Sequence, residues 1–139
     1  MGNVLDWIKV FFAAIGGYLG FFLGGWDGFL YALTVFVVLD YLTGVLVAIT
    51  EKKLSSEVGF KGICRKVLIF VLVGVGHIID TQIIGTGGVV RTAVIFFYVS
   101  NEGISILENA AHLGLPIPQK LKDILAQLKE SEDKEDGVD

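Results

Sequence analysis

The stretch GFLYALTVFVVLDYLTGVLVAIT, from Gly28 to Thr50, decides the fold of this chain. Its only charged side chain is Asp40, which lies at its centre. A helix that crosses the hydrocarbon core of a bilayer, roughly 30 Å thick, needs about 20 mostly apolar residues at about 1.5 Å each. The stretch therefore predicts a transmembrane helix over residues 28–50.

The composition of the whole chain is also that of a membrane protein. Of its 139 residues, 53% are hydrophobic and 19% are charged, whereas roughly 25% are charged in an ordinary soluble domain. The mean hydropathy is +0.69. So few polar groups cannot cover the surface of a soluble domain of this size, and so many apolar residues exclude a disordered chain. The net charge of −4 disfavours nucleic acid as a partner.

Three further segments are long and apolar enough to cross a bilayer, namely residues 7–24, 67–84 and 89–107. The last segment is polar in its second half, so we expect its polar face to meet protein or water. With 28–50, these segments predict an all-α integral membrane protein of about four transmembrane helices. We assign residues 1–110 to this transmembrane domain.

Residues 111–139 differ in composition and predict a cytoplasmic segment. Pro116 and Pro118 break any continuing helix. Apolar residues then recur at helical spacing: Leu121, Ile124, Leu125 and Leu128. We expect a short amphipathic helix over 118–130 and a disordered acidic tail over 130–139.

Basic residues predict the orientation in the membrane. The segment 51–66 holds five of them: Lys52, Lys53, Lys61, Arg65 and Lys66. The turns at 24–27 and 85–88 hold none. The positive-inside rule therefore places 51–66 in the cytoplasm as a basic loop, and four spans then place both termini there. Three spans would instead move the acidic tail outside, and we favour four.

Six of the polar residues within the predicted spans are candidates for functional contacts: Asp40, His77, Asp80, Arg91, Asn101 and Glu102. An ionised carboxylate at the bilayer centre costs about 2.5 kcal/mol or more, so it must face a partner or water. Either these residues line a lumen or a contact between subunits of an oligomer, or they pair internally and hold the bundle together. The excess of acids over bases favours the lumen or the subunit contact. Ser105 and Asn109 extend the stripe of Asn101 and predict interhelical hydrogen bonds.

Small residues at helical spacing indicate surfaces where helix backbones approach closely. Gly16, Gly20 and Gly24 form such a stripe on the first span, and Gly44 follows Asp40 by one turn on the second. In lipid, close packing of small residues drives helix association. The pattern leaves open whether the partner is another helix of the same chain or another subunit.

No pattern of a catalytic or cofactor site is present in the sequence. The two histidines, His77 and His112, do not have the spacing of metal ligands. The single cysteine, Cys64, excludes a disulfide framework and a cysteine zinc site within one chain. Its place beside Arg65 allows palmitoylation, although an unmodified thiol is the simpler interpretation. We therefore expect no enzymatic activity, no cofactor and no metal.

Several motifs follow one another between residues 28 and 125. They are Leu39-Asp40-Tyr41-Leu42-Thr43-Gly44, Lys53-Leu54-Ser55-Ser56, Gly59-Phe60-Lys61-Gly62, Arg65-Lys66, His77-Ile78-Ile79-Asp80, Phe97-Tyr98-Val99-Ser100-Asn101-Glu102, Ser105-Ile106-Leu107-Glu108-Asn109 and Gly114-Leu115-Pro116-Ile117-Pro118. In this combination the chain resembles the phage-lysis and toxin-secretion holins of Gram-positive bacteria and their phages, which include the clostridial toxin-release holins.

This resemblance implies a small protein of the bacterial cytoplasmic membrane that accumulates, forms homo-oligomers and opens lesions at a set time. An endolysin or a large toxin without a signal peptide then leaves the cell as cargo, not as a bound partner. The family has no catalytic residues to transfer to this chain. The alternative function is that of an antiholin or a small regulatory or transporter subunit that forms no wide pore.

Overall fold

The computed structural model describes residues 2–85 and 87–136, and side chains as far as residue 127. The described elements are all helices: α1 (Val4–Leu23), α2 (Gly28–Thr50), α3 (Ser56–Ile78), the π-helical turn η1 (Ile79–Ile84), α4 (Val89–His112) and α5 (Gln119–Asp136). Four of them, with η1 counted as the end of α3, are long and apolar enough to cross a membrane. The prediction of an all-α protein with four spans is confirmed.

Local sequence sets where the helices begin and end. The side chains of Asn3, Asp27 and Ser55 accept hydrogen bonds from the first turns of α1, α2 and α3, respectively. Such caps satisfy N–H groups that have no partner within the helix. Gly24 ends α1 at φ 88° and Gly85 ends η1 at φ 93°, because the left-handed backbone region favours glycine.

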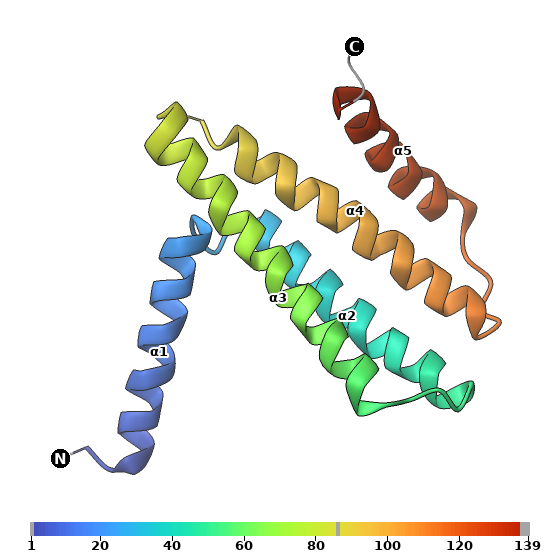
Figure 1. Ribbon diagram of the computed structural model, residues 1–139, viewed down its shortest axis with the longest axis horizontal. Coiled ribbons are helices and arrows are strands. Elements are labelled where there is room, and N and C mark those ends of the chain that lie inside the picture. Colours follow the sequence, from blue (N-terminus) through green and yellow to red (C-terminus); the bar gives the residue numbers. More distant parts are fainter. Residues whose placement is uncertain (1, 86, 137–139) are drawn as a thin grey trace.

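The core of the protein lies between α2, α3 and α4, which form a three-helix bundle (Figure 1). Leu30 and Leu33 of α2, Val73 of α3 and Ile95 of α4 are almost completely buried. A Cβ atom built at Gly76 of α3 would lie 3.1 Å from the backbone Cα of Arg91. The backbones of α3 and α4 therefore approach closely at this glycine.

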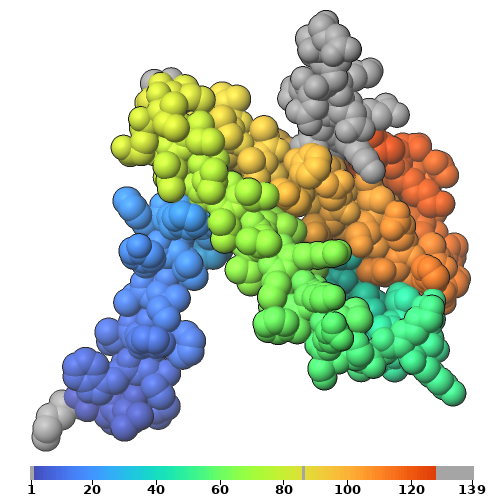
Figure 2. Space-filling model, in the orientation of Figure 1, coloured from blue at the N-terminus to red at the C-terminus, as the bar shows by residue number. Residues whose placement is uncertain are grey.

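The helix α1 leaves the bundle as a separate arm (Figures 1 and 2). Its buried residues are Gly20 and Leu23, both near its C-terminal end. At that end Phe22 packs over Gly74 of α3. The rest of α1 exposes large apolar side chains, including Trp7 at 70% exposure. In a bilayer this surface can face lipid or another protein chain.

The helix α5 packs along α4 (Figure 1). Leu125 is buried there at Gly103, where an added Cβ atom would lie 2.9 Å from its Cδ2 atom. The amphipathic helix predicted after Pro118 is confirmed, and it continues to Asp136, beyond its expected end at residue 130. The side chain of Leu128 and the tail residues 137–139 lie outside the described part.

The largest difference from the predicted boundaries is at the start of the third span; in addition, α1 begins three residues earlier and α4 ends five residues later than expected. We expected a loop over 51–66 and a span over 67–84, but α3 begins at Ser56. Lys61, Arg65 and Lys66 are therefore helical, and of the five basic residues only Lys52 and Lys53 lie in the α2–α3 loop. The physical reason is the Ser55 cap, which starts the helix one residue later.

Candidate functional site

Two carboxylates and one lysine meet inside the bundle, one from each of its three helices. The ammonium group of Lys66 lies 2.6 Å from Oδ2 of Asp40 and 2.8 Å from Oε2 of Glu102. Their side chains are only 18%, 11% and 9% exposed, respectively. We call these three residues the Lys66 cluster. At this burial the bridging ammonium group offsets one of two negative charges that lipid would not tolerate alone.

Neutral polar groups complete the cluster on the side of α4. The hydroxyl of Ser105 donates to Oδ1 of Asp40 at 2.5 Å, and the amide of Asn109 donates to the same oxygen at 3.2 Å. The Asn109 amide also donates to Oγ1 of Thr43 at 2.9 Å. The interhelical hydrogen bonds predicted for Ser105 and Asn109 are therefore present. They join α2 to α4 through Asp40.

A second polar centre closes the opposite end of the bundle. Arg91 of α4 donates from Nη1 to Oδ2 of Asp27 at 2.8 Å, and its Nε and Nη2 atoms donate to the carbonyl oxygens of Leu23 and Gly25 at 2.6 and 3.0 Å. These bonds tie the turn between α1 and α2 to α4. The hydrogen bond from Arg91 is the main reason why the pKa of the Asp27 carboxyl lies below its usual value.

Asp80 caps α4 from the neighbouring π-helical turn. Its carboxylate, in a residue that is 2% exposed, accepts hydrogen bonds from the backbone N–H groups of Val90 and Arg91 at 2.9 and 2.8 Å. Gly88, the residue that precedes α4, supplies no side-chain cap. A carboxylate at a helix N-terminus also interacts favourably with the helix dipole. Asp80 therefore has a structural role in this conformation.

Five of the six candidate polar residues divide between these two centres. Asp40 and Glu102 meet in the Lys66 cluster, while Asp80 and Arg91 meet at the other end. His77 lies there too, since a Cβ atom added at Gly24 would be 2.7 Å from its Nδ1 atom. Asn101 is half-buried and makes no side-chain hydrogen bond to the part of the chain that the structure describes.

The predicted glycine stripe is in contact with a tryptophan. Trp26 folds back over α1, and its indole N–H donates to the carbonyl oxygen of Gly16 at 3.1 Å. A Cβ atom at Gly20 would lie 2.7 Å from that indole nitrogen. Gly24 adjoins Arg91, and Gly44 faces the amide of Asn109. Within one chain Gly20 and Gly24 thus make room for side chains, whereas a Cβ atom at Gly16 would meet none within 4 Å among the described residues.

Two residues of these centres were not identified as such from the sequence. We assigned Lys66 to a loop because it immediately precedes the apolar run at Val67. Ser55, a good N-cap with no proline after it, is the signal that could have extended the helix to include Lys66. Asp27 directly precedes α2, and an aspartate in that position is a known cap signal. Its ion pair with Arg91 depends on tertiary contacts.

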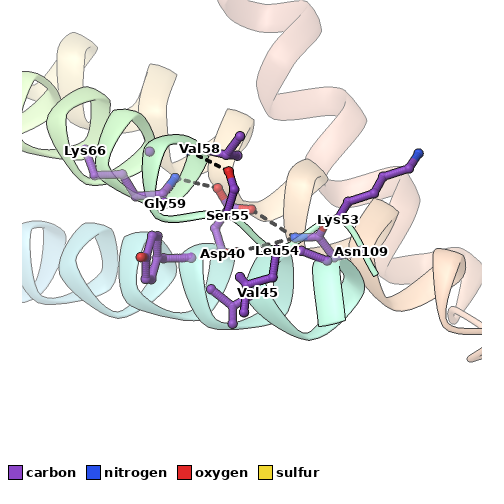
Figure 3. Close-up of a pocket in the computed structure, with 13 residues that line it drawn as sticks. Asp40, Val45, Lys53, Leu54, Ser55, Val58, Gly59, Lys66 and Asn109 are labelled. Carbon is purple, nitrogen blue, oxygen red and sulfur yellow. Dashed lines mark hydrogen bonds and ion pairs between the residues drawn. The ribbon is translucent and has the colours of Figure 1, made fainter. Parts of the chain in front are cut away.

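A hollow of about 210 Å³ lies beside the Lys66 cluster, between α2 and α3 (Figure 3). Asp40, Lys66 and Asn109 line one part of it, and Lys53 and Ser55 of the α2–α3 loop line another. Most of the remaining lining is apolar or glycine. Among the described residues, no group of three acidic, histidine or cysteine side chains could hold a metal ion. The hollow thus joins a charged centre to the loop end of the bundle.

Comparison with known proteins identifies the family. The bacteriophage holin family matches residues 17–130. An uncharacterised 14.9 kDa protein of Clostridium perfringens is 44% identical over 92% of this chain and 97% of its own length. An uncharacterised protein of Listeria monocytogenes is also 44% identical, over 90% of this chain and 89% of its own.

A third relative carries a functional name. A protein of Bacillus phage phi105 described as a probable holin is 36% identical over 85% of this chain and 87% of its own length. No solved structure matches. The family match covers most of the chain, including both polar centres and all of α2, α3 and α4. This multi-pass membrane protein belongs to the bacteriophage holin family.

Proposed function

We propose that this chain is a holin that self-associates in the bacterial cytoplasmic membrane and opens a lesion, without catalysing a reaction. An endolysin, or a large toxin without a signal peptide, leaves through the lesion as cargo. Family membership and the phage relative described as a probable holin support this role. The observation that carries the proposal concerns the polar face of α4, formed by Glu102, Ser105 and Asn109. In the single chain this face points into the bundle.

This polar face can supply the wetted wall of a lesion. Glu102, Ser105 and Asn109 point toward Asp40 and Lys66, and the outer surface of the bundle is largely apolar. An isolated protomer therefore suits lipid, whereas a lesion wall must contact water. In the proposed opening, α4 separates from α2 and α3 when protomers assemble. Water then replaces the contacts within the Lys66 cluster.

The arm α1 is the proposed contact between protomers. It exposes large apolar side chains along most of its length. A Cβ atom at Gly16 or Gly17 meets no atom within 4 Å among the described residues, other than its immediate neighbours and its own helix backbone. Helices in lipid associate where small residues let their backbones approach. We propose that the Gly16 face of α1 packs against a neighbouring protomer.

The orientation follows from the basic residues at the loop end of the bundle. Lys52 and Lys53 lie in the α2–α3 loop, and Lys61 and Arg65 lie on the first turns of α3. By the positive-inside rule we propose that this end faces the cytoplasm, together with both termini.

Co-expression with an endolysin tests the proposed function. The wild-type chain should stop growth abruptly and release a cytosolic marker enzyme when the endolysin is present. Glu102→Gln should leave the membrane level of the protein close to normal, because Lys66 keeps its pair with Asp40. It should shift the time of lysis, because the wetted face loses a charge. Glu108→Gln, on an exposed residue of the same helix, is the matched control and should lyse on schedule.

Two results would contradict the proposal. If cells stay intact with wild-type protein in the membrane and active endolysin in the cytoplasm, the chain is an antiholin or another regulatory subunit. If Glu102→Gln and Glu108→Gln both lyse on schedule at normal protein level, the polar face of α4 has no part in opening.

A further inference from the structure

The seam between α2 and α3 is open along much of its length. α2 packs closely on α4, but its contacts with α3 are few. Two hollows of about 210 and 280 Å³ lie along this seam, and a third of about 340 Å³ continues from them between α3 and the C-terminal end of α1. The first two share Tyr41 and Lys66 as lining residues, and the second and third share Val67 and Phe70. Together they form one groove, which we call the α2–α3 groove.

The groove has the length and lining that an acyl chain requires. Its first two hollows extend along α2 from Ala48 to Val37. Eleven residues of helical rise span about 17 Å, which is close to the hydrocarbon thickness of one leaflet, or half of about 30 Å. Beyond Tyr41 the second hollow is lined almost entirely by apolar side chains: Val37, Val38, Leu42, Ile63, Val67 and Phe70.

The mouth of the groove carries positive charge. Lys53 lines the hollow at the α2–α3 loop; its side chain is 77% exposed and lies 3.8 Å from Oε2 of Glu51, and with Lys52 the loop keeps an excess of positive charge. It extends away from the hollow, at the end opposite Lys66 (Figure 3). The whole segment 51–66 holds five basic residues against Glu51 and Glu57. An occupant of this groove must therefore be apolar over the thickness of one leaflet and carry a negative group at the loop end.

We propose that the α2–α3 groove binds one anionic phospholipid from the leaflet that faces the α2–α3 loop. An acyl chain lies along Val45, Leu42 and Val38, and the headgroup phosphate lies at Lys53. Basic pockets between transmembrane helices bind anionic headgroups in this way. The helix α1 of a second copy fits less well as the occupant, because the charges of Asp6 and Lys9 at its N-terminal end cancel and would not complement a positive groove mouth. The inference concerns lipid recognition and does not depend on whether a lesion forms.

Native mass spectrometry of the detergent-purified chain tests this proposal with phosphatidylglycerol and phosphatidylcholine as probes. The wild-type protein should retain phosphatidylglycerol in preference to phosphatidylcholine. Lys53→Gln should weaken phosphatidylglycerol binding about fivefold, since one lysine near the headgroup is worth about 1 kcal/mol. Lys61→Gln removes the same charge from a residue that does not line the groove, and it should have a smaller effect.

A second pair of variants tests the acyl-chain contact. Ala48→Phe should place a ring in the hollow and reduce the binding of both lipids, whereas Ala14→Phe, on the exposed face of α1, should not. Circular dichroism and gel filtration establish that the variants are folded. Equal retention of the two lipids by the wild type would overturn the proposal, as would equal effects of Lys53→Gln and Lys61→Gln. If Ala48→Phe dissociates an oligomer and leaves lipid binding unchanged, the groove holds a second copy instead.

Discussion

Replacing Lys66 by methionine should strongly destabilise the closed bundle. The substitution keeps an unbranched side chain of similar length but removes the ammonium group that lies 2.6 Å from Asp40 and 2.8 Å from Glu102. Two carboxylates with low exposure would then face each other without a cation. Removing one partner of a buried ion pair costs about 3–5 kcal/mol. We expect a loss of this size in the free energy of unfolding of Lys66→Met.

Lys61→Met is the matched control for this prediction. Lys61 lies on the same helix and pairs with Glu57 at 3.6 Å, but its side chain is 71% exposed. An exposed pair one helical turn apart contributes only about 0.3–0.5 kcal/mol. Reversible unfolding of the purified protein in mixed micelles, followed by circular dichroism at increasing denaturing detergent, gives both free energies.

Neutralising the carboxylates should restore stability to Lys66→Met. Asn and Gln side chains at positions 40 and 102 remove the unpaired charges, and Asn at position 40 can still accept a hydrogen bond from Ser105. The variant with all three substitutions should therefore be more stable than Lys66→Met alone. If Lys66→Met differs from Lys61→Met by less than about 1 kcal/mol, well below the cost of an unpaired buried charge, then Lys66 does not hold these carboxylates in the bundle.

Three other predictions follow from the same contacts. Gly103→Leu should clash with Leu125 and Phe36 and lower the free energy of unfolding by about 1–3 kcal/mol. It should also expose α5 to trypsin cleavage at Lys120 and Lys122, whereas Gly16→Leu should leave that cleavage unchanged. Asp27→Asn keeps the cap of α2 but loses the ion pair with Arg91, so it should lower stability at neutral pH by about 0.2–1 kcal/mol, because Asp27 is partly exposed. The pKa of Asp27 is lowered in the folded state. The stability difference between wild type and Asp27→Asn should therefore be complete above about pH 4, near the pKa of an aspartate in the unfolded chain, and disappear as the pH falls through the pKa of the folded state. Thermal unfolding at several pH values measures this difference. In a Cys64→Ser chain in intact cells, an impermeant maleimide should label a cysteine at Gln82 but not one at Lys53, and the reverse pattern would overturn the proposed orientation.

The sequence was sufficient to predict the spans because each depends on the length of one apolar run. Asp40 and Glu102 could be selected for a similar reason, since each is a charge inside such a run and must have a partner. The partner itself could not be predicted. Lys66 lies next to the end of its run, and its pairing depends on where α3 begins and on how three helices are rotated about their axes.

The position of α1 relative to the bundle could not be predicted from the sequence either. Lipid and neighbouring helices are equally apolar, so hydrophobicity does not determine which of them an apolar helix contacts. The glycine stripe predicted a helix-packing surface, and within one chain a tryptophan lies on part of it. This residue is Trp26, which lies between two spans, where aromatic residues are enriched at the membrane interface. Its contact with Gly16 and Gly20 depends on the tight turn at Gly24.

The central claim is that the polar face of α4 is closed in the resting protomer and wetted in the lesion. Thiol reactivity at Ser105→Cys, in a Cys64→Ser chain, tests it most directly, because a cysteine reacts as the thiolate and needs contact with water. A membrane-permeant maleimide is applied to cells before lysis and again at its onset, with Glu108→Cys as the exposed control. The account predicts a protected Cys at position 105 before lysis and rapid labelling at its onset, while the control is labelled at both times. Equal labelling of position 105 before and during lysis would contradict the account.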